Sequence, residues 1–131
     1  MKTYTISQVA EQFSLKPHTL RFYESEGLLK AERTEAGVRR YTEENLRQLE
    51  TVLCLKGTGM PLKDIRRYFQ LVEEGSGTLE ERLEIILAQR KRVLAEIDAL
   101  QKNLKTIEHK VNWYRELCAE AGLTGKNMNK M

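Results

Sequence analysis

The last third of the chain carries one apolar stripe with a seven-residue repeat, and this stripe limits what the chain can fold into. No Pro or Gly interrupts it between Thr78 and Cys118. The stripe positions follow steps of three and four residues: Ile86, Arg90, Val93, Ile97, Leu100, Leu104, Ile107, Val111, Tyr114 and Cys118. Such alternation keeps one seam of a helix facing a partner helix. We therefore expect one long helix whose seam is buried by a second copy of itself.

The ends of this helix are marked by local signals. Thr78 and Glu81 have the spacing of a capping box, and Gly122 marks the end. A helix of about 40 residues spans roughly 60 Å, which is longer than a domain of this size is wide. The expected role is a rigid spacer between two bodies, and the alternative is a helix that folds back on its own N-terminal domain. Arg90 interrupts the seam, which predicts a role in fixing register or orientation.

Composition narrows the classes of function. The 131 residues have a net charge of +3, which permits nucleic-acid binding without demanding it. Cys54 and Cys118 are the two cysteines, and they form neither a disulfide framework nor a zinc-ligand pattern. The sequence shows no secretory signal and no apolar run of membrane-spanning length. We expect a cytoplasmic protein with free thiols, no metal and no cofactor.

The N-terminal part has the pattern of a helix-turn-helix. Thr5 and Gln8 predict a capping box for a first helix over residues 6–13. Pro17 suits the first position of a second helix, and Gly27 suits the position after its end. Two short helices joined by a tight turn are typical of this motif.

The following segments predict a wing and two more helices. After Leu28 and Leu29, residues 30–40 form a polar, basic arm around Gly37, which favours an exposed β-ribbon. Thr42 can cap a third helix over residues 43–56, and Pro61 begins a fourth that ends at Gly75. The expected organisation is a DNA-binding head over residues 1–75, a dimerisation helix over 76–121 and a flexible tail over 122–131.

The second helix and the arm carry the candidate DNA-binding residues. Leu20 should face the core, which directs the other side chains outward. Basic and hydrogen-bonding side chains on such a helix suit phosphates and base edges in a major groove. A solvated basic face is the alternative for the helix alone, and the arm favours DNA because it extends the same cationic surface. The candidates are Lys16, His18, Thr19, Arg21 and Phe22 on the helix, and Arg39, Arg40 and Tyr41 on the arm.

The segments TISQVAEQFSLKPHTLRFYESEGLL, AGVRRYTEENL and LKGTGMPLKDIRRYF, followed by the long helix, resemble the MerR family of bacterial transcription regulators. The resemblance implies a mainly α-helical protein: a winged helix-turn-helix head, and a homodimer held by an antiparallel coiled coil. It also implies an operator in an overlong promoter spacer, which the dimer bends and untwists for RNA polymerase. Carried over by position, Thr19, Arg21, Phe22 and Tyr23 belong to the recognition helix.

Cys54 is the candidate sensor residue. It lies next to Lys56 and just before the Gly57 to Gly59 joint, and a lone cysteine here resembles the small AdhR/NmlR-like branch, which responds to aldehydes or other electrophiles. Local cations would favour the reactive thiolate. The alternative is an inert core thiol, because Cys54 shares a helical arc with leucines and free Cys is often buried.

The predicted function is therefore a promoter-binding regulator, and no enzyme. The alternatives are a coiled-coil protein-interaction module, or the same kind of regulator with a different effector and an inert Cys54. No nucleophile, base and acid set can be placed beside Cys54, and His18 and His109 are isolated. The expected dimer interface consists of Ile86, Val93, Ile97, Leu100, Leu104, Ile107, Val111 and Tyr114.

Overall fold

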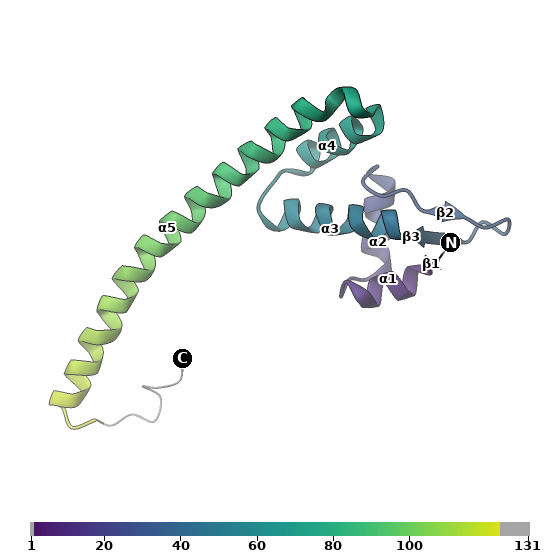
Figure 1. The fold of residues 1–131 in the computed structure, drawn as a ribbon. Helices are drawn as coiled ribbons and strands as arrows, with labels where there is room; N and C mark the ends of the chain where they lie inside the picture. Colours follow the sequence, from purple (N-terminus) through teal and green to yellow (C-terminus); the bar gives the residue numbers. More distant parts are fainter. Residues whose placement is uncertain (1, 124–131) are drawn as a thin grey trace. The chain divides into compact units, whose positions relative to one another are not determined.

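The computed structural model describes residues 2–123. The elements run β1 (Thr3–Tyr4), α1 (Ile6–Gln12), α2 (Pro17–Ser25), β2 (Glu32–Arg33), β3 (Arg39–Thr42), α3 (Glu43–Gly57), α4 (Leu62–Glu74), the 3-10 turn η1 (Ser76–Thr78) and α5 (Leu79–Glu120) (Figure 1). The chain divides into two compact units, residues 1–89 and residues 90–131, and α5 contributes to both. Across residues 2–123, no helix has the length and apolarity that a membrane crossing requires.

Local capping sets the helix-turn-helix. The Thr5 side chain accepts from Gln8 N, and the Gln8 side chain accepts from Thr5 N, so the predicted capping box of α1 is confirmed. At the other end of the motif, Gly27 has φ +76 and follows the last turn of α2. Leu28 N donates to Tyr23 O at 3.0 Å, which satisfies a carbonyl that the end of the helix leaves open.

The wing is a hairpin in a three-stranded antiparallel sheet of order β1-β3-β2. Arg33 pairs with Arg39, and Thr3 pairs with Thr42. β1 is an element that the sequence did not predict, because a two-residue strand has no period to read. Gly37 has φ +80 in the loop between β2 and β3, where a residue with a Cβ would be strained.

Asn45 joins the wing to α3. Its side chain accepts from Thr42 N at 2.9 Å, and Thr42 Oγ1 accepts from Asn45 N at 3.1 Å. Its Nδ2 also donates to Lys30 O at 3.0 Å, at the base of the wing. The expected Thr42 cap is confirmed, and Asn45 adds a buried polar bridge that helix patterning does not reveal.

The core of the head is built from its four helices α1 to α4, from β3 and from the segment after α2. Leu20, Leu49 and Ile65 are fully buried, and they come from α2, α3 and α4. Pro61 occupies the N-cap position of α4, so this helix begins one residue later than expected.

The start of α5 differs from the sequence prediction. The predicted capping box of Thr78 and Glu81 is wrong, because Thr78 Oγ1 donates to Leu71 O at 2.6 Å and to Gly75 O at 2.8 Å. Glu81 instead accepts from Arg67 at 2.9 Å. The hydroxyl of Thr78 therefore closes the end of α4 and does not open α5.

The first turns of α5 belong to the head unit, which extends to residue 89, whereas the sequence placed the domain boundary after residue 75. Ile85 packs against the core. Gln89 is buried, and its Nε2 donates to Thr58 O at 3.0 Å and to Thr58 Oγ1 at 2.7 Å. Of the expected tail, residues 124–131 lie outside the described residues.

Candidate nucleic-acid interface

The outward surface of α2 carries four of the predicted DNA-binding side chains. Lys16, His18, Arg21 and Phe22 are exposed, and Phe22 has 48% of its surface accessible. Thr19 is half-buried. Leu20 is fully buried, as its helical position predicted. Among the described residues, neither Lys16 nor Arg21 forms an ion pair, so both cations are open to phosphates.

Two predicted contact residues, Tyr23 and Tyr41, need correction. Their side chains are 1% and 0% exposed, so neither can reach a DNA backbone or base from this position. Tyr23 lies in the core, and its hydroxyl accepts from Lys56 Nζ at 3.3 Å. Both rings lie on the inner faces of their elements, where each buries a large apolar area. They therefore stabilise the outer surface of α2 and the wing through packing.

Glu24 clamps the wing to α2. Its Oε1 accepts from Arg33 on β2 at 3.0 Å, and its Oε2 accepts from Arg39 on β3 at 2.5 Å. The carboxylate thus holds both strands of the hairpin against the helix before it. Glu24 was not among the predicted residues, and no local sequence signal marks it, since both partners are distant in sequence.

Two basic residues of the wing form hydrogen bonds within the protein. Arg39 is committed to Glu24, and this hydrogen bond is the main cause that raises the pKa of its guanidinium. Arg40 Nε donates to Thr3 Oγ1 at 3.1 Å, which ties β3 to β1. The sequence prediction placed both arginines on the DNA, and the structure shows each of them half-buried and holding a strand.

The tip of the wing remains available. Arg33 also donates to Gly37 O at 3.2 Å, and Gly37 N donates to Thr34 O at 2.9 Å, so the loop is closed by its own hydrogen bonds. Val38 is exposed beside Gly37. A loop closed by its own hydrogen bonds has a shape that could lie along the edge of a DNA groove.

Tyr41 lies among the charges of this interface. Burial raises the pKa of its phenol, and Glu24 raises it further, whereas Arg39, Arg33 and Arg21 lower it. Its hydroxyl has no hydrogen-bond partner among the described residues, and it is buried. The neutral phenol therefore fills the space under the wing as a largely apolar group.

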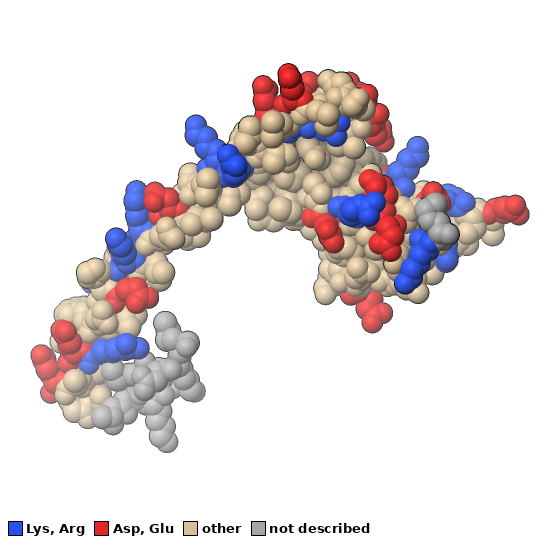
Figure 2. Space-filling view, viewed as in Figure 1, with Lys and Arg blue, Asp and Glu red and all other residues tan. Residues whose placement is uncertain are grey.

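Charge on the head is mixed. Figure 2 shows cationic and acidic side chains close together on the visible face, so the surface is not a uniform cationic field. Binding to a polyanion must then depend on where individual cations stand. No group of three or more His, Cys, Asp or Glu residues that could hold a metal ion occurs within the described part of the chain.

Cys54 is exposed on α3, so the alternative of a buried core thiol is wrong. The pattern misled because Leu49 and Val52 are buried on the neighbouring arc, while position 54 points outward. The ammonium group of Lys56 lies over the Tyr23 ring and donates to its hydroxyl. The Lys56 side chain therefore packs on the Tyr23 ring.

The seam of α5 is exposed in the single chain. Leu100, Leu104 and Ile107 have 67%, 52% and 56% of their surface accessible. Ile86, Ile97 and Tyr114 are also exposed, and Val93 and Val111 are half-buried. Leu79 and Leu83 are exposed as well, and they continue the seven-residue repeat toward the N-terminal end of α5. The repeat itself was the signal that identifies these two additional positions.

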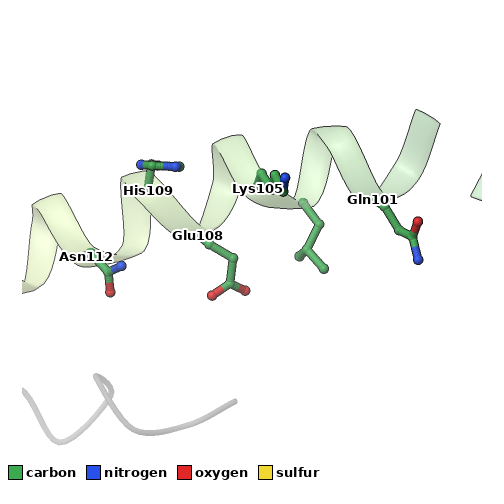
Figure 3. A pocket seen from close by; sticks show the side chains of 6 residues that line it. Gln101, Lys105, Glu108, His109 and Asn112 are labelled. Atoms are coloured by element: carbon green, nitrogen blue, oxygen red, sulfur yellow. The ribbon is translucent and has the colours of Figure 1, made fainter. Parts of the chain in front are cut away.

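Polar side chains border the seam. Figure 3 shows Gln101, Glu108 and Asn112 projecting to one side of α5, where they line a shallow hollow with Leu104 and Lys105. His109 lines the same hollow. Polar residues that border an apolar stripe are typical of a coiled-coil helix whose flanks face solvent.

These features define a winged helix-turn-helix protein of the DNA-binding class. The chain belongs to the MerR family: the model described as MerR HTH family regulatory protein matches residues 4–72, and the model described as MerR, DNA binding matches residues 46–110. Proteins of this family are transcriptional regulators and not enzymes. The chain is a MerR-type DNA-binding transcriptional regulator.

Three relatives are similar over much of the chain. An HTH-type transcriptional regulator of Haemophilus influenzae is 39% identical over 127 residues, which are 96% of this chain and 94% of that one. The regulator AdhR of Bacillus subtilis is 37% identical over 90 residues, 68% of this chain and 64% of AdhR. The crystal structure of HiNmlR, a MerR family regulator lacking the sensor domain, bound to promoter DNA, superposes with a TM-score of 0.84 at 40% identity, covering 93% of this chain and 97% of that one.

Proposed function

We propose that this regulator acts as a homodimer that bends and untwists promoter DNA for RNA polymerase, with its α5 helices paired in an antiparallel coiled coil. The observation that carries the proposal is the row of exposed apolar side chains that repeats every seven residues along α5. Large exposed apolar patches mark interaction surfaces. A second copy of the same helix offers the matching stripe.

The DNA half of the proposal is supported by the outer surface of α2 and by the closed wing loop. HiNmlR, which shares this fold, was crystallised on promoter DNA. Bending a site of 20 to 30 base pairs costs on the order of 1 to 6 kcal/mol. Two heads held by one stiff coiled coil can supply enough phosphate contacts to offset that cost. Recognition should then depend partly on how easily the promoter deforms.

Gel shifts on DNA upstream of the regulator's own gene test the first half. We expect one retarded species, with an affinity that falls steeply as salt rises because phosphate contacts release counterions. A scrambled fragment of the same length and base composition is the control. Equal binding to both fragments would refute sequence-specific promoter binding and favour a protein-interaction module.

Sedimentation equilibrium tests the dimer. Leu100→Glu places a carboxylate in the seam, and we expect monomers at concentrations where the native protein is a dimer. Thr106→Glu adds the same charge at an exposed position outside the seam and should leave the dimer intact. A native protein that sediments as a monomer would contradict the proposal.

We also propose that Cys54 senses aldehydes or other electrophiles. Its exposure supports this role, because a reactive thiol has to be accessible. The thiolate sulfur would add to an aldehyde carbonyl carbon; the C=O π electrons move to oxygen, which takes a proton, and a hemithioacetal forms. With a nitrosating agent, sulfur would bond to nitrogen while the agent's leaving group departs with its electron pair. Either adduct adds bulk to α3 near Thr58.

Transcription from a reporter promoter tests the sensor. Cys54→Ser should keep DNA affinity and abolish the aldehyde response, whereas Cys118→Ser should retain the response. Mass spectrometry of the treated protein should locate the adduct on Cys54. An unchanged response of Cys54→Ser would end the sensor proposal and favour a different effector, while promoter binding would stand.

A further inference from the structure

The first turns of α5 present two faces with different tasks. One face holds Arg82, Ile85 and Gln89, spaced by three and four residues, and all three contact the head. The other face holds Leu79, Leu83 and Ile86, which are exposed and begin the seam. At 3.6 residues per turn, the two faces lie about a quarter turn apart on the helix. Any rotation of α5 about its axis against the head would therefore turn the seam by the same angle.

Two polar contacts oppose that rotation. Arg82 donates to Gly75 O at 2.9 Å and to Thr78 Oγ1 at 3.0 Å, which holds the first turns. Two turns later, Gln89 Nε2 donates to the carbonyl and to the hydroxyl of Thr58. Gln89 is 5% exposed and is the last residue of the head unit. It is the final anchor before α5 leaves the unit.

Thr58 connects this anchor to α3. It is the C-cap residue of α3, where the last carbonyls of the helix lack partners within the helix. Its Oγ1 donates to Cys54 O at 2.9 Å, and its N–H also donates to Cys54 O, at 3.0 Å. The same hydroxyl accepts from Gln89. The Thr58 side chain therefore donates to a carbonyl at the end of α3 and also binds α5. A buried amide that lost these acceptors would be left partly unsatisfied.

We propose that Gln89 is a positioning residue that fixes the rotation of α5 against the head, and that the Gln89 and Thr58 contact thereby sets the promoter spacing that the regulator accepts. This inference rests on the proposed homodimer. In a dimer, the direction of the seam in each head sets where the partner head stands. One inserted base pair moves a half-site by about 3.4 Å and turns it by about 35°. A dimer whose α5 is held firmly by Gln89 should bind operators of altered spacing weakly. A dimer in which this contact is lost should bind them with less penalty.

The test compares operators whose half-site separation is changed by one base pair at a time. Gln89→Leu removes the donor with little change in size, and Thr58→Val removes only the hydroxyl. The native protein should discriminate steeply between the best and the shifted operators. We expect Gln89→Leu to reduce that discrimination about fivefold and Thr58→Val to reduce it less, in the same direction. Gln70→Leu, an exposed position on α4, is the matched control and should leave it unchanged.

Two measurements separate the outcomes. Sedimentation of the native protein decides the dimer first, because a monomer would overturn the proposed function and this inference with it. If the dimer stands, variants that bind every operator more weakly by one common factor would show a purely structural role and overturn the inference. Should Gln89→Leu fail to fold by circular dichroism, Thr58→Val carries the test, and a native spacing preference in that variant would overturn the inference.

Discussion

The Glu24 carboxylate lies 2.5 Å from the Arg39 guanidinium and so joins α2 to the wing. An acid on the proposed DNA-binding surface would repel phosphate, yet Glu24 also holds Arg33 and Arg39 in place. The two effects have opposite signs, so a substitution shows which of them dominates.

Glu24→Gln should weaken promoter binding about three- to tenfold, because charge-assisted hydrogen bonds to Arg33 and Arg39 are lost and the wing loosens. Fluorescence anisotropy with labelled operator measures this change. Glu35→Gln removes an exposed wing carboxylate and should raise the affinity slightly. Tighter binding by Glu24→Gln would show that charge repulsion outweighs positioning at this site.

Tyr41→Phe should leave the free energy of unfolding unchanged or raise it by up to about 1 kcal/mol, because the native hydroxyl is buried and finds no hydrogen-bond partner within residues 2–123. Chemical denaturation at neutral pH measures this. Tyr68→Phe, which removes the hydroxyl of a half-buried tyrosine on α4, is the control. A loss well above 1 kcal/mol in Tyr41→Phe would reveal a partner for that hydroxyl.

The same variant should respond less to alkaline pH. Burial raises the pKa of Tyr41 above 10.0, the value of a free phenol, so the unfolded chain ionises first as pH rises. The stability contributed by the neutral phenol is complete below about pH 10 and is lost as pH rises through the folded-state value. Denaturation curves from pH 8 upward should therefore be less pH-dependent above about pH 10 for Tyr41→Phe than for the native protein. Equal slopes would contradict the burial effect.

Asn45→Ala should destabilise the head by about 1 to 3 kcal/mol, because Thr42 N and Lys30 O both lose a buried partner. Asn45→Asp keeps the acceptor for Thr42 N and removes the donor to Lys30 O. We therefore expect a smaller loss for Asp, measured by thermal unfolding. Equal losses of stability in the two variants would show that the whole effect comes from the hydrogen bond to Lys30 O.

Arg90→Leu tests the polar interruption of the seam. A charged residue at one seam position specifies register at some cost in stability, so the variant should form mixed oligomers with unchanged helicity. Lys91→Leu, outside the seam, is the control. Analytical ultracentrifugation distinguishes the species, and a more stable but otherwise unaltered dimer would contradict the register role.

Most elements of the fold follow from local chemistry. The Thr5 and Gln8 cap, Pro17 at the start of α2, Gly27 after it and the Thr42 cap all act within a few residues, and the structure confirms each of them. The long helix was predicted because its repeat runs for many turns. Capping signals act within a few residues, and an apolar repeat extends over many turns, so both can be recognised in the sequence alone.

The composition of the candidate site depended on packing between distant segments. Tyr23 and Arg39 have the right residue types for DNA contact, but one enters the core and the other binds Glu24, fifteen residues away. Exposure of Cys54 was likewise decided by which arc of α3 packs against β3 and α4. Residue type does not specify which of two neighbouring faces a helix buries.

By itself, the sequence determined the helix-turn-helix, the wing and the apolar seam of the long helix, since capping, turns and periodicity are properties of neighbouring residues. Only the tertiary structure decided that Thr78 closes α4, that Glu24 holds the wing, and that Gln89 reaches Thr58 across 31 positions of the chain. The physical reason is that hydrogen-bond partners far apart in sequence are chosen by the packing of whole elements, which no local pattern records.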